Sequence, residues 1–136
     1  MTNYTRLVAV CCELRQGLEH NNILKNCKKV GEFLSKPEFT LIEIFTKNSN
    51  VGLKKGNRSV IFEVYEVNVT KLDEISRIKC FYQYNYANNL NNKVLIDTPY
   101  GEAYVFFETK TEITKDNIIK DYDYVDYYIY RQLLNK

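Results

Sequence analysis

The sequence lacks tryptophan and contains little proline, glycine, methionine or histidine. Two prolines and five glycines among 136 residues argue against long disordered linkers. No apolar run approaches the roughly 20 residues that a membrane-spanning helix needs. The first ten residues, MTNYTRLVAV, lack the pattern of a secretory signal peptide. These absences favour a cytoplasmic globular protein with one domain, residues 1–136.

The charge balance excludes an interaction based on net charge alone. Nineteen Lys and Arg residues against 17 Asp and Glu residues give a net charge of +2. This value is too small to predict binding to nucleic acid or to a membrane surface. The chain is rich in Asn, Lys, Ile and Tyr, a composition typical of an AT-rich genome, such as that of a bacterium or its phage.

The cysteines, at positions 11, 12, 27 and 80, have no metal-binding spacing, and the only histidine is His20. No C-x-x-C pattern occurs, and neighbouring Cys11 and Cys12 would point to opposite faces of a strand. A cysteine nucleophile would need an activating base, for which only His20 is present. We therefore predict reduced, packed thiols, no metal site and no cofactor.

Hydrophobic periodicity and turn residues predict an alternation of strands with a few helices. Predicted helices lie at about 18–27, at 70–77 with Thr70 as N-cap, and at about 114–135. A loop rich in Asn and Gly is predicted at 48–58. Strands are predicted at 5–10, 28–35, 39–47, 59–69, 78–87, 93–98 and 102–110. This order indicates an α+β fold with a curled antiparallel or mixed sheet, closed by a C-terminal helical extension.

Six fragments, in order from about residue 6 to 108, resemble the γ-glutamylcyclotransferase-like family. The first is CCELRQG (11–17), in the frame of the family's Tyr-Gly-Ser/Thr-Leu-Arg-x-Gly loop. The others resemble further family segments: EHNNILKN (19–26), SNVGL (49–53), FEVYEV (62–67), LDEIS (72–76) and AYVFFE (103–108). In addition, Tyr82–Tyr84 resembles a Tyr-x-Arg strand of the family.

The resemblance implies a small β-barrel with flanking short helices and one cavity, lined by loop 11–16 and by position 76. In the family, loop N–H groups hold the γ-glutamyl group, and a Glu takes a proton from the substrate's α-amine. The amine then attacks the γ-carbonyl and releases 5-oxoproline. Carried onto this sequence, the ligand-binding positions are Cys11, Cys12, Glu13, Leu14, Arg15, Ser76, Tyr82 and Tyr104.

The sequence departs from the family at the position of the proton acceptor. The Glu that closes Leu-Asp-x-x-Glu is replaced by Ser76, and a serine hydroxyl cannot hold a proton at neutral pH. Glu74 lies about 200° away around a helix and is expected to face away from the cavity. In the loop, Cys12 replaces a glycine, and Glu13 adds a negative charge where a substrate carboxylate would bind. No residue is therefore predicted to be catalytic.

Other polar and aromatic residues have competing interpretations. Glu63 and Glu66 should face opposite sides of their strand, and a solvated surface charge is the favoured interpretation for either. Tyr82, Tyr84 and Tyr86 share one face, which indicates a core or dimer interface more than a stacking platform.

The preferred hypothesis is a catalytically inactive γ-glutamylcyclotransferase-like protein that binds a small molecule in a remodelled cavity. A phage protein that sequesters a host metabolite or nucleotide signal would fit this pattern. The alternative is an active cyclotransferase that uses an unidentified acid. The second alternative is a protein–protein inhibitor module acting through the tyrosine-rich C-terminal helix. The partners considered are a small-molecule ligand, a second copy of the chain or a host protein.

Overall fold

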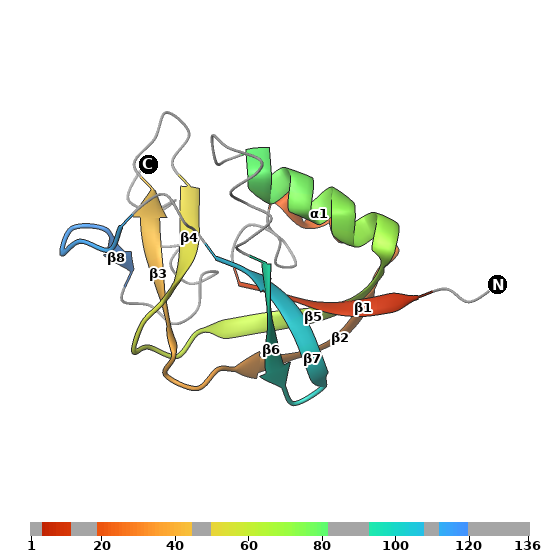
Figure 1. Cartoon of the computed structure of the whole chain (residues 1–136), viewed down its shortest axis with the longest axis horizontal. Coiled ribbons are helices and arrows are strands. Elements are labelled where there is room, and N and C mark those ends of the chain that lie inside the picture. The colour runs from red at the N-terminus through yellow and green to blue at the C-terminus, as the bar shows by residue number, and fades with distance from the viewer. Residues whose placement is uncertain (1–3, 12–18, 45–49, 82–92, 108–111, 120–136) are drawn as a thin grey trace.

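The computed structural model describes residues 4–11, 19–44, 50–81, 93–107 and 112–119 (Figure 1). Within these ranges the chain forms eight strands, one α-helix and one 3₁₀ helix. Their bounds in chain order are β1 (Thr5–Val10), η1 (Glu19–Leu24), β2 (Lys28–Leu34), β3 (Phe39–Ile44), β4 (Asn50–Lys55), β5 (Ile61–Asn68), α1 (Val69–Phe81), β6 (Lys93–Thr98), β7 (Gly101–Phe106) and β8 (Ile118–Ile119). No helix among these residues is long and apolar enough to cross a membrane.

The strands form two sheets rather than a barrel. The larger has the order β2-β5-β1-β7-β6, and the smaller has the order β4-β3-β8. β1 and β7 run parallel, whereas the other pairs are antiparallel, so the larger sheet is mixed. The predicted α+β class and mixed sheet are confirmed. The predicted barrel is wrong, because among the described strands β2 and β6 remain edges, and a barrel requires its edge strands to pair.

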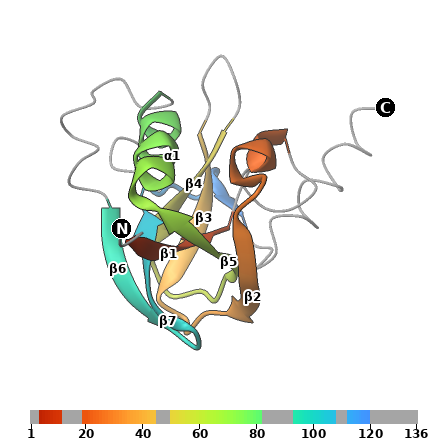
Figure 2. The ribbon, with the colours of Figure 1, turned by 90° about the vertical axis from the view of Figure 1, so that its right-hand side faces the viewer.

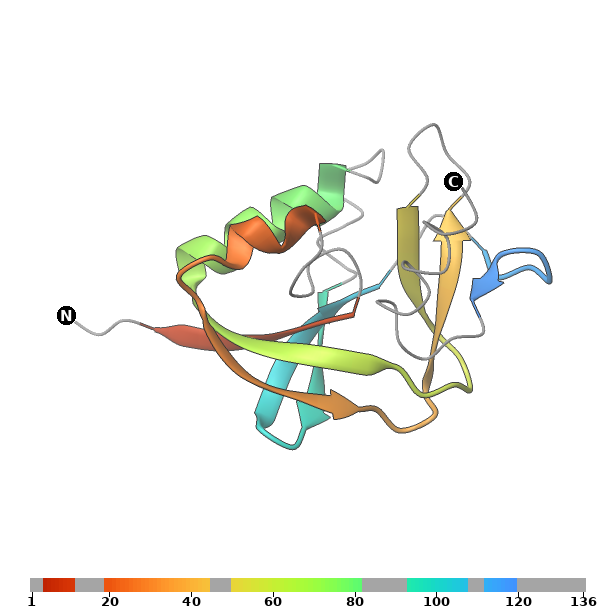
Figure 3. The same ribbon diagram turned by 180° about the vertical axis from the view of Figure 1, so that it is seen from behind.

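The five-stranded sheet is covered on both faces by different partners. Alternation along β5 sends Phe62 and Val64 to one face, and Tyr65 and Val67 to the other. The first face packs against the three-stranded sheet. The second packs against α1 and η1, which lie on the same side of β1 and β5 in Figures 2 and 3. Two hydrophobic clusters result, one on each face of a shared sheet.

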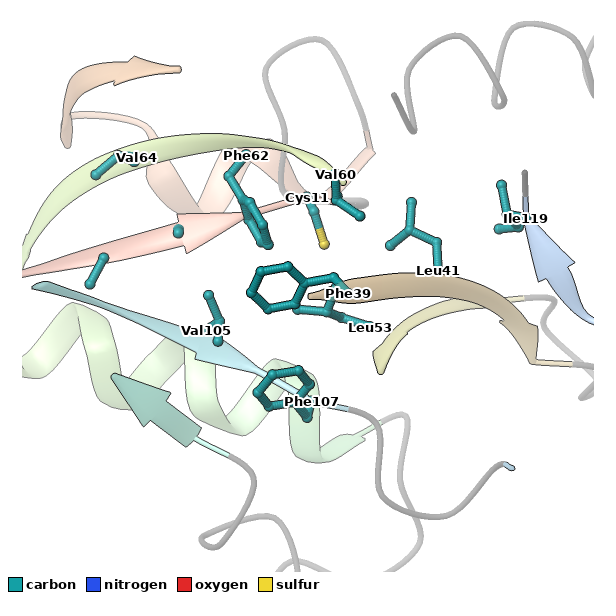
Figure 4. Close-up of a cluster of buried hydrophobic side chains, with 12 residues drawn as sticks. Cys11, Phe39, Leu41, Leu53, Val60, Phe62, Val64, Val105, Phe107 and Ile119 are labelled. Carbon is teal, nitrogen blue, oxygen red and sulfur yellow. The ribbon is translucent and has the colours of Figure 1, made fainter. Parts of the chain in front are cut away.

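Aromatic rings fill the cluster between the two sheets (Figure 4). The Phe39 ring meets Phe62 edge to face, with ring centroids 5.3 Å apart, and stacks on Phe107 at 6.0 Å. Phe33 also stacks on Phe62, with ring centroids 5.4 Å apart. Such pairs add to the burial of a large apolar area, so these rings join the two sheets into one body.

Helix α1 starts directly after β5, and its cap differs from the one predicted. The backbone N–H of Lys71 donates to the Asn68 side-chain oxygen at 2.7 Å, so Asn68, not Thr70, caps the helix. The helix continues to Phe81, where the sequence predicted the start of strand 78–87. The later residues of that predicted strand lie outside the described ranges.

Two further elements differ from the prediction. β4 occupies most of the predicted loop 48–58 and pairs along its full length with β3. Near the C-terminus, a helix was predicted from about residue 114, but the chain makes a turn and then the short strand β8, which pairs with Leu41 and Ile42. The helix prediction is wrong for residues 118–119. The remaining residues of the predicted helix, 120–135, lie outside the described part of the chain.

Candidate functional site

Three of the eight predicted ligand-binding residues lie in the described ranges: Cys11, Ser76 and Tyr104. Cys12, Glu13, Leu14, Arg15 and Tyr82 lie outside them. The predicted closeness of Cys12 and Ser76 therefore stays a prediction.

Cys11 follows the last residue of β1, and its side chain lies in the core between the two sheets. It is 6% exposed, and its sulfur points toward the Phe39 and Phe62 rings (Figure 4). This face of the sheet is opposite to the one that α1 covers. A role of Cys11 in a ligand loop near α1 would therefore use its backbone N–H rather than its thiol.

Ser76 lies on α1, next to the helix residues that pack on the sheet. Leu72 and Ile75 are buried against β1 and β5, and Ser76 is half-buried beside them. The Ser76 hydroxyl donates to the Leu72 carbonyl of the preceding turn, at 3.0 Å. The hydroxyl proton is thus directed to the helix backbone, and this position offers no carboxylate.

Glu74 does not substitute for a carboxylate at position 76. Its side chain is 49% exposed and pairs with Lys71 on the outer surface of α1, with an Nζ–Oε2 distance of 3.0 Å. The helical geometry predicted from sequence placed Glu74 away from the covered face, and its exposure agrees with that prediction.

Glu63 is the buried carboxylate of this region. It is 2% exposed and accepts a hydrogen bond from the Tyr65 hydroxyl at 2.9 Å. It shares the face of Tyr65, which packs with Leu72 and Ile75 of α1. Its register partner on β1 is Val10, two positions before the loop residue Cys12.

The interpretation of Glu63 as a solvated charge is therefore wrong, whereas it is right for Glu66, which is exposed. Strand alternation separates the two side chains, and the covering helix decides which one is buried. The signal available in the sequence was the neighbouring Tyr65, which supplies a hydroxyl donor two residues along the same face.

Tyr104 of β7 also lies on the α1 side of the sheet, where it packs against the cluster containing Val8. The Lys93 ammonium sits 5.0 Å from the centre of its ring. Tyr104 lines a cavity of about 300 Å³ together with Arg6, Glu66 and Glu102, among others. The described candidates Ser76, Glu63 and Tyr104 are thus on the same side of one sheet.

Cys27 packs partly buried against the same cluster. Burial raises the pKa of this thiol, an effect that nearby Lys71 opposes and Glu74 reinforces. A raised pKa keeps the sulfur protonated at neutral pH and does not favour a nucleophile. Within the described ranges, no three His, Cys, Asp or Glu side chains come together to hold a metal ion.

The sequence is 29% identical over 108 residues to a "putative gamma-glutamylcyclotransferase" of Vibrio cholerae, a match that covers 77% of this chain and 84% of that protein. This chain resembles a γ-glutamylcyclotransferase. The predicted resemblance to that family is thereby confirmed at the level of sequence similarity. No protein-family model matches the chain.

Solved structures show the same fold. An uncharacterized protein from Pyrococcus horikoshii matches 94% of this chain and 97% of its own, with a TM-score of 0.69 and 21% identity. Protein ytfP from Escherichia coli matches 90% of this chain and 98% of its own, with a TM-score of 0.57 and 21% identity. Allophanate hydrolase from Kluyveromyces lactis contains a similar unit over 22% of its length, with a TM-score of 0.68 and 13% identity.

Proposed function

We propose that this γ-glutamylcyclotransferase-like protein binds a small molecule on the α1 side of the five-stranded sheet and does not catalyse cyclotransfer. The observation that carries the proposal is the geometry of Ser76, the residue that the sequence resemblance aligns with the family's proton acceptor. Its hydroxyl is hydrogen-bonded to the Leu72 carbonyl, and the adjacent acid, Glu74, pairs with Lys71 on the outer surface.

The chemistry explains why this position matters. The substrate's α-amine is an ammonium at neutral pH, and it has no lone pair for attack until a base removes a proton. Loss of a positioned base lowers the rate by about 10²–10⁴-fold. A hydroxyl that already donates to a helix carbonyl offers no comparable proton acceptor.

The loop residues support a ligand other than a γ-glutamyl compound. Glu13 would repel the substrate carboxylate, and Cys12 would crowd a loop whose N–H groups must approach an oxyanion. Arg15 matches the Arg of the family's loop, and its guanidinium can bind an anionic group of a ligand through two parallel hydrogen bonds. Together with the composition, this favours a phage protein that sequesters a host metabolite or nucleotide signal.

A second candidate function is an active cyclotransferase with Glu63 as the proton acceptor. It is favoured by the buried carboxylate of Glu63, which lies beside Val10 at the end of β1 and accepts from Tyr65. It ranks second because the family strand that FEVYEV resembles, Gly-Glu-Val-Tyr-Glu-Val, already has Glu at this position. Glu63 is therefore no new residue that compensates for Ser76.

The test measures 5-oxoproline release from γ-glutamyl amino acids, γ-glutamyl amines and glutathione. The unmodified protein should release none above a buffer control, and Ser76→Glu alone should restore little. Ser76→Glu combined with Cys12→Gly and Glu13→Ser should restore some release. Turnover by the unmodified protein at about 1 per second or faster would overturn the proposal, and its loss in Glu63→Gln would establish the second candidate.

Ligand binding is tested separately by native mass spectrometry of protein purified from its natural host. We expect a retained small molecule, which Arg15→Ala should release. Protein that carries no adduct, and that binds none from a deproteinised host extract, would contradict the binding half of the proposal.

A further inference from the structure

A cavity of about 620 Å³ lies between β2 and β6, the two edges of the five-stranded sheet. Residues 33–36 line it on one side and residues 95–99 on the other. Because neighbouring residues of a strand point to opposite faces, runs of consecutive lining residues indicate that the cavity faces the edges of the strands. We call this cavity and its two edges the seam.

The backbone of Leu34 is directed into the seam. The Ser35 N–H donates to the Val60 carbonyl at 2.9 Å, so residue 35 directs its backbone toward the β5 side. The Glu32 carbonyl instead accepts from the Tyr100 hydroxyl at 2.9 Å, across the gap. Alternate residues of an antiparallel ladder direct their N–H and C=O groups to opposite sides. Leu34 therefore shares the outward direction of Glu32.

Tyr100 closes one end of the seam. Its ring rests on Gly31 of β2, where an added Cβ would collide with the tyrosine hydroxyl. The turn that carries it is well fixed, because the Thr98 hydroxyl accepts from the Tyr100 N–H and donates to the Gly101 carbonyl, and Gly101 has a φ of 117°. The β6–β7 turn thus meets β2 in a defined position (Figure 3), and the cavity is formed in advance.

The rim of the seam is unusually apolar for exposed sheet edges. Leu34 is 57% exposed, Leu95 46% and Tyr100 39%. These three are half of the six large hydrophobic residues that are exposed in the described part of the chain. Natural proteins usually protect apolar edge strands because such edges pair with other chains. The exposed charges at the seam are Glu38, Asp97 and Lys36, so acids outnumber bases there.

We propose that the seam docks a short extended peptide segment of another protein, with aliphatic side chains and flanking basic residues, as an added strand on the edge of β2. The outward Leu34 backbone supplies the hydrogen bonds, Leu34 and Leu95 supply apolar contacts, and Glu38 and Asp97 select positive charge. Residues 33–36 line the β2 side of the cavity, so a segment that runs along these four residues spans roughly 13 Å at about 3.3 Å per residue. Leu95 also lines the cavity beside Tyr104, so the seam adjoins the α1 side of the sheet at this residue.

The test is a titration of the ¹⁵N-labelled full chain with the capped peptide Lys-Val-Ile-Val-Lys, followed by amide chemical shifts. We expect the largest shifts at Leu34 and in 95–98. A peptide methylated on its central backbone nitrogens should bind at least about tenfold more weakly, and the Glu-flanked analogue several-fold more weakly. Equal binding of the methylated peptide would overturn strand addition.

Variants of the protein sharpen this test. Leu34→Pro removes the outward N–H without removing the Ser35–Val60 bond, and it should abolish binding. Leu95→Ala should weaken binding several-fold, whereas Ile113→Ala, which is similarly exposed at 42%, should not. If Leu34→Pro fails to fold, the methylated peptide on the unmodified chain still decides. The same amides are also followed against protein concentration when no peptide is present. If they shift and added peptide does not reverse those shifts, the seam binds a second copy of the chain, and the proposal is overturned.

Discussion

The two faces of the five-stranded sheet are built on different principles. The face toward the three-stranded sheet is packed with aromatic rings, and Phe62 contacts both Phe33 and Phe39. The face toward α1 buries a carboxylate, Glu63, together with its tyrosine donor Tyr65. Buried polar groups stabilise little by themselves and are costly once a partner is lost. The first face therefore contributes stability through apolar packing alone, whereas the second combines apolar packing with one buried polar pair.

The largest effect is expected on the aromatic face. Phe62→Ala should lower the free energy of unfolding by about 3–5 kcal/mol, because Phe62 is fully buried and its removal leaves a cavity between two sheets. Urea denaturation of the variant measures this loss. Phe33→Ala, at a half-buried position, should cost clearly less. A loss below about 1 kcal/mol for Phe62→Ala would contradict the assignment of stability to this face.

The polar pair on the other face should show a smaller effect. Tyr65→Phe removes only a hydroxyl, but it takes a donor from the buried Glu63, and we expect a loss of about 1–3 kcal/mol in urea denaturation. Tyr104→Phe is the matched control, because within the described chain the Tyr104 hydroxyl makes no hydrogen bond. If both variants lower the free energy of unfolding by the same amount, the Tyr65–Glu63 hydrogen bond contributes no measurable stability.

The helix that covers the polar face depends on its cap. Asn68→Ala should lower the free energy of unfolding by about 0.5–2 kcal/mol, because the Lys71 N–H loses its acceptor. Thr70→Ala, at the cap position predicted from sequence, should change it by less than about 0.5 kcal/mol, since Thr70 is an exposed residue inside the helix. If Thr70→Ala lowers the free energy of unfolding more than Asn68→Ala does, Thr70 is the cap, as the sequence predicted.

The apolar strands could be predicted from the sequence because the hydrophobicity of their own side chains determines that they are buried. β1, β5, β6 and β7 appear where hydrophobic runs predicted them. β4 was missed because Asn and Gly residues indicate a loop. Its pairing is a tertiary effect: Gly52 lies opposite Ile42 in a complete antiparallel ladder with β3, which local propensity does not reveal.

For the candidate site, the sequence predicts which side chains of β5 share a face, but not which of the two faces is buried. The sequence separates Glu63 and Glu66 onto opposite faces, yet which face α1 covers follows only from the packing of Leu72 and Ile75. The 78–81 segment was misread for a related reason. Its apolar and aromatic residues suit a strand as well as a helix, and continuity with α1 decides between them.

The smallest effect is expected at Ser76, and it tests the central proposal. Its hydroxyl bonds to the carbonyl of its own helix, and alanine is the better helix former by a few tenths of a kcal/mol, roughly. Ser76→Ala should therefore change the free energy of unfolding by less than about 0.5 kcal/mol, whereas the neighbouring Ile75→Ala should cost about 2–5 kcal/mol. A loss above about 1 kcal/mol for Ser76→Ala would mean that the hydroxyl serves a buried polar partner. In that case position 76 would belong to a polar network on the α1 side, and the conclusion that its hydroxyl is occupied by the helix would fall.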